Sequence, residues 1–239
     1  MRLVASKENV GGWHNIPAEN KENTNDGEIS SFRARLLWDP TDRLSLNFLY
    51  SQNKSEQDGG MLLESLEGSV ANGRSGDYND IDNELYSVTF VYDFDFASLN
   101  STTTKIDAQN DAEVTFQFPL DPSGVLSAGE ELESDAVNNE TRLVSLGDGP
   151  IQWMAGFFYS DTEFTNDQYT SSPLLPPSTQ VFKSESLSVF GEASLELMDG
   201  KLIPLVGVRY FEDDRETEST AFGGWSDKDT FDSVNPRFN

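Results

Sequence analysis

Histidine, cysteine and carboxylate side chains carry much of protein chemistry, and this sequence contains very little of the first two. It has no Cys and a single His, His14, which follows Trp13 in the run Gly11-Gly12-Trp13-His14-Asn15. The lack of Cys excludes disulfides and thiolate chemistry, and one His excludes a multi-His metal site. Trp13 and His14 are candidates for a ligand contact. A solvated loop histidine is the simpler interpretation of His14, because no second His or Cys assists it.

Carboxylates are abundant by contrast, and they form dense runs at Asp77–Asp82, Glu130–Asp135 and Glu212–Glu216. Oxygen-rich loops can bind calcium, but the run at 77–82 lacks the glycine and the distant glutamate of an EF-hand. We therefore expect hydrated, mutually repelling loop surfaces. With 42 acidic residues, many pairs of carboxylates could be chosen as candidates for glycoside hydrolysis. Such pairs therefore do not predict this activity. No catalytic residue, metal ligand or cofactor is expected.

Charge and composition narrow the class of protein further. The formal net charge of −26 argues against binding of nucleic acid, which needs clusters of Lys and Arg. The N-terminal residues lack the apolar stretch of a signal peptide, and no run approaches the ~18 apolar residues of a membrane helix. A hydrophobic content of 36% with this charge is typical of disorder, yet the aromatic content of 11% is not. The chain is therefore expected to be ordered.

Alternation of apolar and polar residues is the main structural signal. From Tyr86 to Phe94 and from Ile151 to Tyr159, aromatic and aliphatic residues occupy every second position, which predicts strands with one apolar face. The weak helix candidate is Met61–Val70. The predicted strands cover residues 1–8, 31–38, 44–52, 84–94, 98–108, 139–147, 151–163, 184–197, 202–212 and 231–239.

The connections between these strands alternate between short and long. Short turns rich in Gly, Pro or Asp are predicted at 39–42, 93–97, 147–150 and 198–201. Long polar loops are predicted at 8–30, 53–83, 109–138, 165–183 and 212–230. A meander of up-and-down antiparallel strands, with all its long loops at one end, produces this order, whereas a Greek-key sandwich usually does not.

Strand length and aromatic placement favour a membrane barrel. Most predicted strands are near the ~9–11 residues that a tilted membrane strand needs, and aromatic residues such as Trp38 and Tyr210 cluster at strand ends. The alternative is that these are ordinary core aromatics of a soluble β protein. A charge on the lipid face costs ~2–4 kcal/mol near the bilayer midplane. The arginines among the apolar alternation are therefore expected to face the lumen, namely Arg33, Arg35, Arg142 and Arg209. They could pair with acids of a further domain inside the barrel or line a transport path, and salt bridging within the lumen without a transport role is an equally open alternative.

Five short motifs then occur in a fixed order along the chain. They are Arg2–Ser6 with Gly11–Asn15, Arg33–Thr41, Thr141–Ser145 with Trp153–Tyr159, Val189–Ala193 with Gly207–Tyr210, and Val234–Arg237. In this order the set resembles the barrel hairpins of TonB-dependent outer-membrane receptors, and the resemblance covers nearly the whole chain. These receptors hold an N-terminal plug domain inside a 22-stranded barrel. No plug is apparent here, so the resemblance implies that residues 1–239 are the N-terminal part of the barrel, about ten strands.

The resemblance also implies a function, a location and partners. It implies uptake of iron–siderophore complexes or similar scarce organic ligands across the outer membrane of a Gram-negative bacterium, energised through TonB by way of the missing N-terminal part. Outer-membrane lipid and lipopolysaccharide would surround the barrel. Bridging of lipopolysaccharide phosphates to the acidic runs by divalent cations is an alternative that the sequence leaves open. No enzymatic activity is expected.

Two other classes of function stay open at this point. One is a passive porin-like barrel, which a plug would distinguish from a receptor. The other is a soluble, secreted, β-rich binding module, in which the apolar faces would pack against a second sheet. A ten-stranded outer-membrane protease would need a His beside acids at the barrel rim, and only His14 is available.

Overall fold

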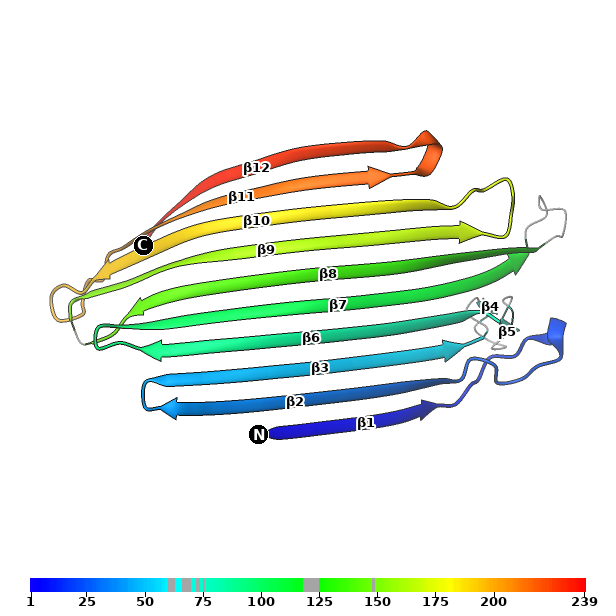
Figure 1. Cartoon of the computed structure of the whole chain (residues 1–239), viewed down its shortest axis with the longest axis horizontal. Helices are drawn as coiled ribbons and strands as arrows, with labels where there is room; N and C mark the ends of the chain where they lie inside the picture. The colour runs from blue at the N-terminus through cyan, green and yellow to red at the C-terminus, as the bar shows by residue number, and fades with distance from the viewer. Residues whose placement is uncertain (60–62, 66–69, 72–73, 75, 118–124, 148) are drawn as a thin grey trace.

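The computed structural model describes residues 1–59, 63–65, 70–71, 74, 76–117, 125–147 and 149–239, and most of them belong to one layer of long antiparallel strands (Figure 1). The strands are β1 (Arg2–Val10), β2 (Gly27–Thr41), β3 (Leu44–Asp58), β4 (Leu63–Ser65), β5 (Val70–Ala71), β6 (Tyr78–Asp93), β7 (Ala97–Gln117), β8 (Val125–Ser145), β9 (Ile151–Thr170), β10 (Ser178–Leu195), β11 (Leu205–Ser219) and β12 (Trp225–Phe238). Two short 3-10 helices, η1 (Pro17–Glu19) and η2 (Ala221–Gly223), lie in the loops.

The sheet is an up-and-down meander. Its ten strands follow the order β1-β2-β3-β6-β7-β8-β9-β10-β11-β12, and each strand pairs antiparallel with the next. In Figure 1 the connections β2–β3, β6–β7, β8–β9 and β10–β11 lie at one end of the sheet, called here the turn end, and the other end, where β1 leads into β2 and β11 into β12, is called the loop end. β1 and β12 form the two edges, so the sheet is not closed. The predicted fold class is confirmed. The predicted alternation of short and long connections fails at the C-terminal end, where residues 196–204 join β10 to β11 and only residues 220–224 join β11 to β12.

The strands are longer than the sequence predicted. β7 and β8 have 21 residues each, which spans about 70 Å at ~3.4 Å per residue. The predicted loop at 109–138 was wrong, because β7 continues to Gln117 and β8 begins at Val125. Other predicted strands were also too short at the loop end, because β2 begins at Gly27 and β9 continues to Thr170. In these segments acids and other polar residues replace the apolar residues of one face, while the other face keeps apolar residues such as Ala112, Val114 and Leu126.

Smaller differences concern the turns and the helix candidate. Asp39 to Thr41 belong to β2, and the tight turn lies at Asp42 and Arg43. The strand predicted to begin at 202 begins at Leu205. Of the helix candidate Met61–Val70, residues 63–65 and 70 are in strands, and the rest lies outside the described residues. No helix in the described part of the chain is long and apolar enough to cross a membrane.

The two faces of the sheet differ in chemistry. We call the face that carries Trp38, Phe48, Tyr86, Phe157 and Val189 the outer face, and the opposite one the inner face. The outer face carries a continuous apolar band over the turn-end half of the strands, and those five side chains are all more than a third exposed. Among the described residues, the fully buried apolar side chains are only Ile16, Ala97 and Leu126. A one-layer sheet of this kind needs lipid on its apolar band, so the soluble two-sheet module is disfavoured.

We predict that residues 1–239, produced alone without detergent, do not form a stable monomer. Both edge strands leave unpaired backbone groups, and the apolar band has no covering layer. Size-exclusion chromatography and far-ultraviolet circular dichroism test this expectation. A monomer that melts cooperatively without detergent would contradict it.

Candidate functional site

The four arginines singled out in the sequence all lie on the inner face. The register pairs Arg33 with Ser51, Arg35 with Leu49, Arg142 with Gly156, and Arg209 with Phe190. The residues beside them in the chain, such as Ala34 and Leu143, belong to the outer face. The inner wall therefore carries cations at the level at which the outer face is apolar. Whether these arginines contact a ligand stays a prediction.

Arg142 is held in place by an acid and an aromatic ring. Its Nε donates to Glu140 Oε1 at 2.5 Å, and its guanidinium lies 5.9 Å from the centre of the Phe190 ring. That ring occupies the space above Gly156, because a Cβ added there would come within 2.8 Å of the ring carbon Cζ. The glycine in the motif Trp153–Tyr159 thus has a physical role, which is to admit Phe190 beside Arg142.

Arg209 has no carboxylate partner among the described residues but is held by a hydroxyl group. Its Nε and Nη2 donate to Ser188 Oγ at 3.1 and 2.8 Å, and Ser188 is fully buried. On the neighbouring strands, Arg237 Nη1 donates to Glu192 Oε2 at 3.1 Å. The inner wall over β8 to β12 is therefore a network of arginines with partners.

The sequence analysis missed the most buried charged group of this network, Asp213. Its Oδ1 accepts hydrogen bonds from Ser184 Oγ at 2.7 Å and Ser186 Oγ at 2.9 Å, and its Oδ2 accepts from Arg215 Nε at 2.6 Å. Burial raises the pKa of Asp213, but the hydrogen bonds from Ser184, Arg215 and Ser186 outweigh burial and leave the pKa below its ordinary value. Hydroxyl residues at every second position of β10 were the available signal, since alternation places them on one face.

Substitution of Asp213 by Asn is expected to loosen β10 and β11 locally. It removes a charge-assisted contact to Arg215 and unbalances a buried network, which costs about 2 kcal/mol. Because the pKa of Asp213 is lower in the folded state, its contribution is present at neutral pH and is lost as the pH falls through the folded pKa. Amide hydrogen exchange in the whole receptor measures the effect. The matched control is Asp227→Asn, on the inner face of β12, and equal protection in both variants would contradict the assignment.

The two loop candidates, Trp13 and His14, differ in how deeply they are buried. His14 is only 5% exposed, so the expectation of a solvated histidine was wrong, whereas Trp13 is 50% exposed. Asn25 Oδ1 accepts the backbone N–H groups of Trp13 at 2.8 Å and His14 at 2.7 Å, and the two rings meet edge to face at 3.7 Å. The loop therefore buries His14 and presents Trp13 to solvent.

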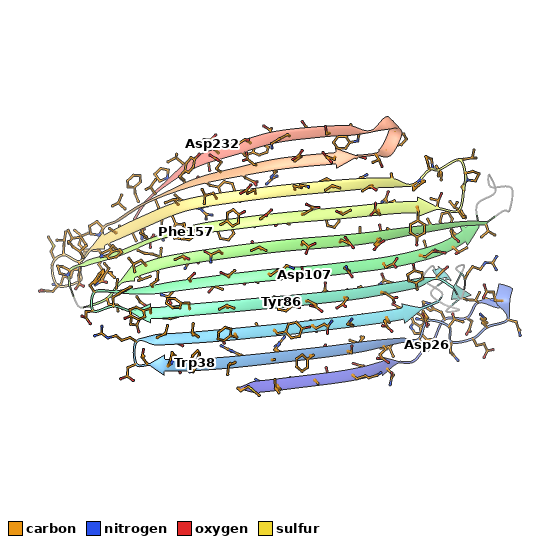
Figure 2. The ribbon with its side chains drawn as sticks, viewed as in Figure 1. Asp26, Trp38, Tyr86, Asp107, Phe157 and Asp232 are labelled. Atoms are coloured by element: carbon orange, nitrogen blue, oxygen red, sulfur yellow. The ribbon has the colours of Figure 1, made fainter. Side chains whose placement is uncertain are left out.

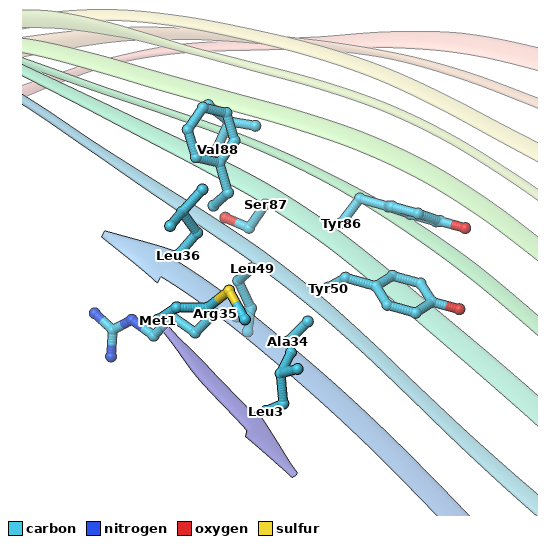
Figure 3. A pocket seen from close by; sticks show the side chains of 11 residues that line it. Met1, Leu3, Ala34, Arg35, Leu36, Leu49, Tyr50, Tyr86, Ser87 and Val88 are labelled. Carbon is cyan, nitrogen blue, oxygen red and sulfur yellow. The ribbon is translucent and has the colours of Figure 1, made fainter. Parts of the chain in front are cut away.

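On the outer face, the apolar band ends at a row of tyrosines, Tyr50, Tyr86, Tyr159 and Tyr210, which we call the tyrosine row. The hydroxyl groups of the last three donate to carboxylates one step nearer the loop end, on Glu84, Glu185 and Glu212. The Tyr50 and Tyr86 rings lie side by side above a shallow apolar hollow of about 300 Å³, with both hydroxyls pointing the same way (Figure 3). Such a row is typical of the level at which a membrane meets water.

Beyond the tyrosine row, the outer face is strongly acidic. We call these carboxylates the acidic collar; they are Glu56, Asp80, Asp82, Glu84, Asp107, Asp111, Glu113, Glu131, Glu133, Asp135, Asp161, Glu163, Asp167, Glu185, Glu212, Asp214, Glu216 and Glu218. Figure 2 shows the sequence of levels, with Trp38 and Phe157 nearest the turn end, then Tyr86, then Asp107. The acidic runs at 130–135 and 212–216, expected in loops, lie in β8 and β11.

Lysines neutralise only part of the negative charge of the acidic collar. Lys54 pairs with Asp82 at 2.6 Å, Lys105 with Asp107 at 2.7 Å, and Lys183 with Glu163 at 3.1 Å. Like charges also face each other directly, as Asp107 and Asp135 do, with Lys105 Nζ 4.0 Å from Asp135 as well. No group of three or more His, Asp and Glu in the described part of the chain has the arrangement of a metal site.

Two members of the collar, Asp135 and Asp80, have a raised pKa. The hydrogen bond with Asp107, followed by burial, raises the pKa of Asp135. Burial, followed by the charges of Glu56, Asp58 and Asp111, raises the pKa of Asp80. An acid with a raised folded pKa adds stability below its unfolded pKa and loses that contribution as the pH rises through the folded pKa.

The variant Asp135→Asn is therefore expected to stabilise the whole receptor at pH 7, with a benefit that fades as the pH falls through the raised pKa of the unsubstituted carboxyl. Unfolding by guanidinium in detergent at several pH values measures this. The control is Asp42→Asn at the turn end. A stabilisation that is independent of pH would contradict the repulsion.

Comparison with known proteins identifies the family. The family model described as "TonB dependent receptor-like, beta-barrel" matches residues 38–239. The chain belongs to this family. No curated protein matches the sequence.

Solved structures of receptors share the fold of this barrel segment. The ferric yersiniabactin uptake receptor FyuA from Yersinia pestis has a TM-score of 0.74 at 20% identity, over 99% of this chain and 39% of that one. The ferric citrate transporter FecA has a TM-score of 0.66 at 11% identity, over 98% and 36%. The siderophore receptor PiuA from Acinetobacter baumannii has a TM-score of 0.65 at 12% identity, over 99% and 42%. The chain thus spans about two fifths of the length of the receptors that it matches.

Proposed function

We propose that this chain is the N-terminal part of the barrel wall of an outer-membrane receptor that imports iron–siderophore complexes or similar scarce organic ligands, with energy delivered through TonB. The observation that carries the proposal is the family match over residues 38–239 together with the fold shared with FyuA, FecA and PiuA. The family and these structures are receptors and transporters, which supports a role without catalysis.

The two faces of the sheet support the same role. The apolar band and the tyrosine row suit outer-membrane lipid, and the arginine-bearing inner face suits an aqueous lumen. The strands beyond the tyrosine row would carry the loops clear of the membrane, towards lipopolysaccharide and the medium. A plug domain and the segment that meets TonB would come from parts of the protein outside this sequence.

Within this segment, we assign Trp13 as a loop contact for the ligand and His14 as the residue that positions it. A half-exposed indole held by a buried neighbour offers an aromatic surface at little cost in conformational entropy. The inner-face arginines Arg142 and Arg209 would keep the wall rigid, because their partners already occupy them.

Uptake by cells tests the proposed function. The whole receptor gene is expressed in a Gram-negative host without its own siderophore receptors, and iron-55 uptake is measured with ferric yersiniabactin and ferric citrate. We expect saturable uptake of at least one complex that ceases when TonB is deleted. Uptake that continues without TonB would indicate a passive pore, and no uptake of these or other ferric siderophores would reject the function.

Replacing Trp13 by Ala is expected to raise the half-saturating ligand concentration about fivefold, because a stacking contact is worth roughly 1 kcal/mol. The maximal rate per receptor on the cell surface should hardly change. The matched control is Trp38→Ala, at the turn end of β2. Equal effects of the two substitutions would show that Trp13 acts only through folding.

A further inference from the structure

The connection between β1 and β2, which carries Trp13, is held against the base of the connection between β3 and β6 at the loop end (Figure 1). Asp58 N, at the end of β3, donates to Asp26 O at 2.9 Å. Arg74 Nη1 lies 3.7 Å from Glu19 Oε1. The loop that presents Trp13 is therefore fixed by a second connection as well as by its own contacts.

Asp77, the residue before β6, closes the base of the second connection. It is only 1% exposed, so the expectation of a hydrated surface at 77–82 was wrong for this residue. Its Oδ2 accepts the backbone N–H of Arg74 at 3.0 Å, and its own N–H donates to Arg74 O at 3.1 Å. Its carbonyl oxygen accepts the N–H of Gly59 at 2.6 Å. Asp77 thus closes the turn that begins at Arg74 and joins the two ends of the connection.

One route of contacts leads from Asp77 to Trp13 through the backbone. Gly59 packs so closely on Thr24 that a Cβ added at Gly59 would lie 2.4 Å from Thr24 O. Thr24 N donates to His14 O at 2.8 Å, and the His14 ring meets the Trp13 ring edge to face at 3.7 Å. A shift of Gly59 is therefore passed to the indole through hydrogen bonds and close packing.

A second route passes through the contact of Arg74 with Glu19, at the end of η1. Glu19 N donates to Ile16 O at 3.0 Å, and Ile16 is 1% exposed. Ile16 N in turn donates to Lys21 O at 2.9 Å. The loop is folded on itself, so a shift at Glu19 moves it as a unit.

A buried carboxyl group at position 77 is costly, and its contacts explain why it is there. Burial raises the pKa of Asp77 and outweighs the hydrogen bonds from Arg74 and Thr115, which lower it. An apolar side chain would avoid this cost but would leave the buried N–H of Arg74 without its acceptor. An amide side chain would supply the same acceptor without the charge.

We propose that Asp77 is a positioning residue for the ligand contact at Trp13, because it holds the base against which the loop of Trp13 is fixed. The inference rests on the proposed function, in which Trp13 contacts the ligand. At 1% exposure Asp77 cannot meet a ligand itself, and it acts through Gly59 and Arg74. Without its side chain the turn at Arg74 loosens and Trp13 loses its fixed orientation, while the paired strands of the barrel wall stay in place.

A double-mutant cycle of Asp77→Ala and Trp13→Ala in the whole receptor tests the proposal, with iron-55 uptake of ferric citrate and ferric yersiniabactin as the measurement. Asp77→Ala should raise the half-saturating concentration about threefold, with an unchanged maximal rate per receptor on the cell surface. In the Trp13→Ala receptor the same substitution should hardly change it, because the contact that Asp77 positions is already lost. Asp77→Asn should restore the half-saturating concentration of the unmodified receptor.

The matched control is Ser172→Ala in the connection between β9 and β10. Ser172 is 4% exposed, and its Oγ accepts the N–H of Leu174 at 3.4 Å, so this variant also removes a buried acceptor of a backbone N–H at the loop end. It should leave the half-saturating concentration unchanged. If Asp77→Ala does not reach the cell surface, Asp77→Ser, which shortens the side chain, replaces it in the cycle.

Amide hydrogen exchange of the purified receptor without any ligand separates this proposal from the proposed function. Asp77→Ala should speed exchange at His14 and Thr24 and leave β9 to β11 unchanged. Unchanged exchange at these two residues would overturn the proposal, as would additive effects in the cycle or a failure of Asp77→Asn to restore uptake. Faster exchange in the variant, with no uptake of ferric complexes by the unmodified receptor, would reject the proposed function and leave the hold of Asp77 on the loop standing.

Discussion

The whole structure depends on one constraint, which is that every backbone N–H and C=O in a one-layer sheet must find its partner on the neighbouring strand. The antiparallel ladder of the ten-stranded sheet meets this constraint along its paired strands, apart from a register shift between Trp38 and Thr41 and the two edges. Pairing across the ladder also fixes the face of every side chain, because register partners share a face. The apolar band, the tyrosine row, the acidic collar and the inner arginines are all consequences of that single alternation.

Charge is distributed across this ladder in an unusual way. Most carboxylates of the strands are on the outer face beyond the tyrosine row, where they face water and each other. Within the membrane-facing half, charged groups occur on the inner face, as Arg33, Arg142 and Arg209 do. Desolvation explains the second pattern, since lipid excludes ions whereas an aqueous lumen does not. The net charge of −26 therefore says little about the wall that a ligand would meet.

Residues of the same sequence motif have different structural roles in this fold. Gly156 leaves room for the Phe190 ring, on which Arg142 rests, and Ser188 is a buried acceptor for Arg209. Trp13 and His14 are neighbours in the chain, yet one is presented to solvent and the other is buried against the loop. Asn25 holds this part of the loop by accepting the backbone N–H groups of both residues. It is 11 and 12 residues away in the sequence, so no local pattern indicates the contact.

The sequence by itself determined the strands, their antiparallel order, the family, and the inward placement of Arg33, Arg35, Arg142 and Arg209. Those features are local, because period-two hydropathy and turn residues can be read within a few positions. Only the tertiary structure decided how far each strand extends, since the outer face of the loop-end halves is acidic and resembles a polar loop in the sequence. It also decided which arginines have acids beside them. Arg142 meets Glu140 on its own strand, whereas the environment of Arg35 depends on Arg2 across β1 and Asn47 across β3. Such cross-strand neighbours are set by register between segments distant in the chain, which no local pattern encodes.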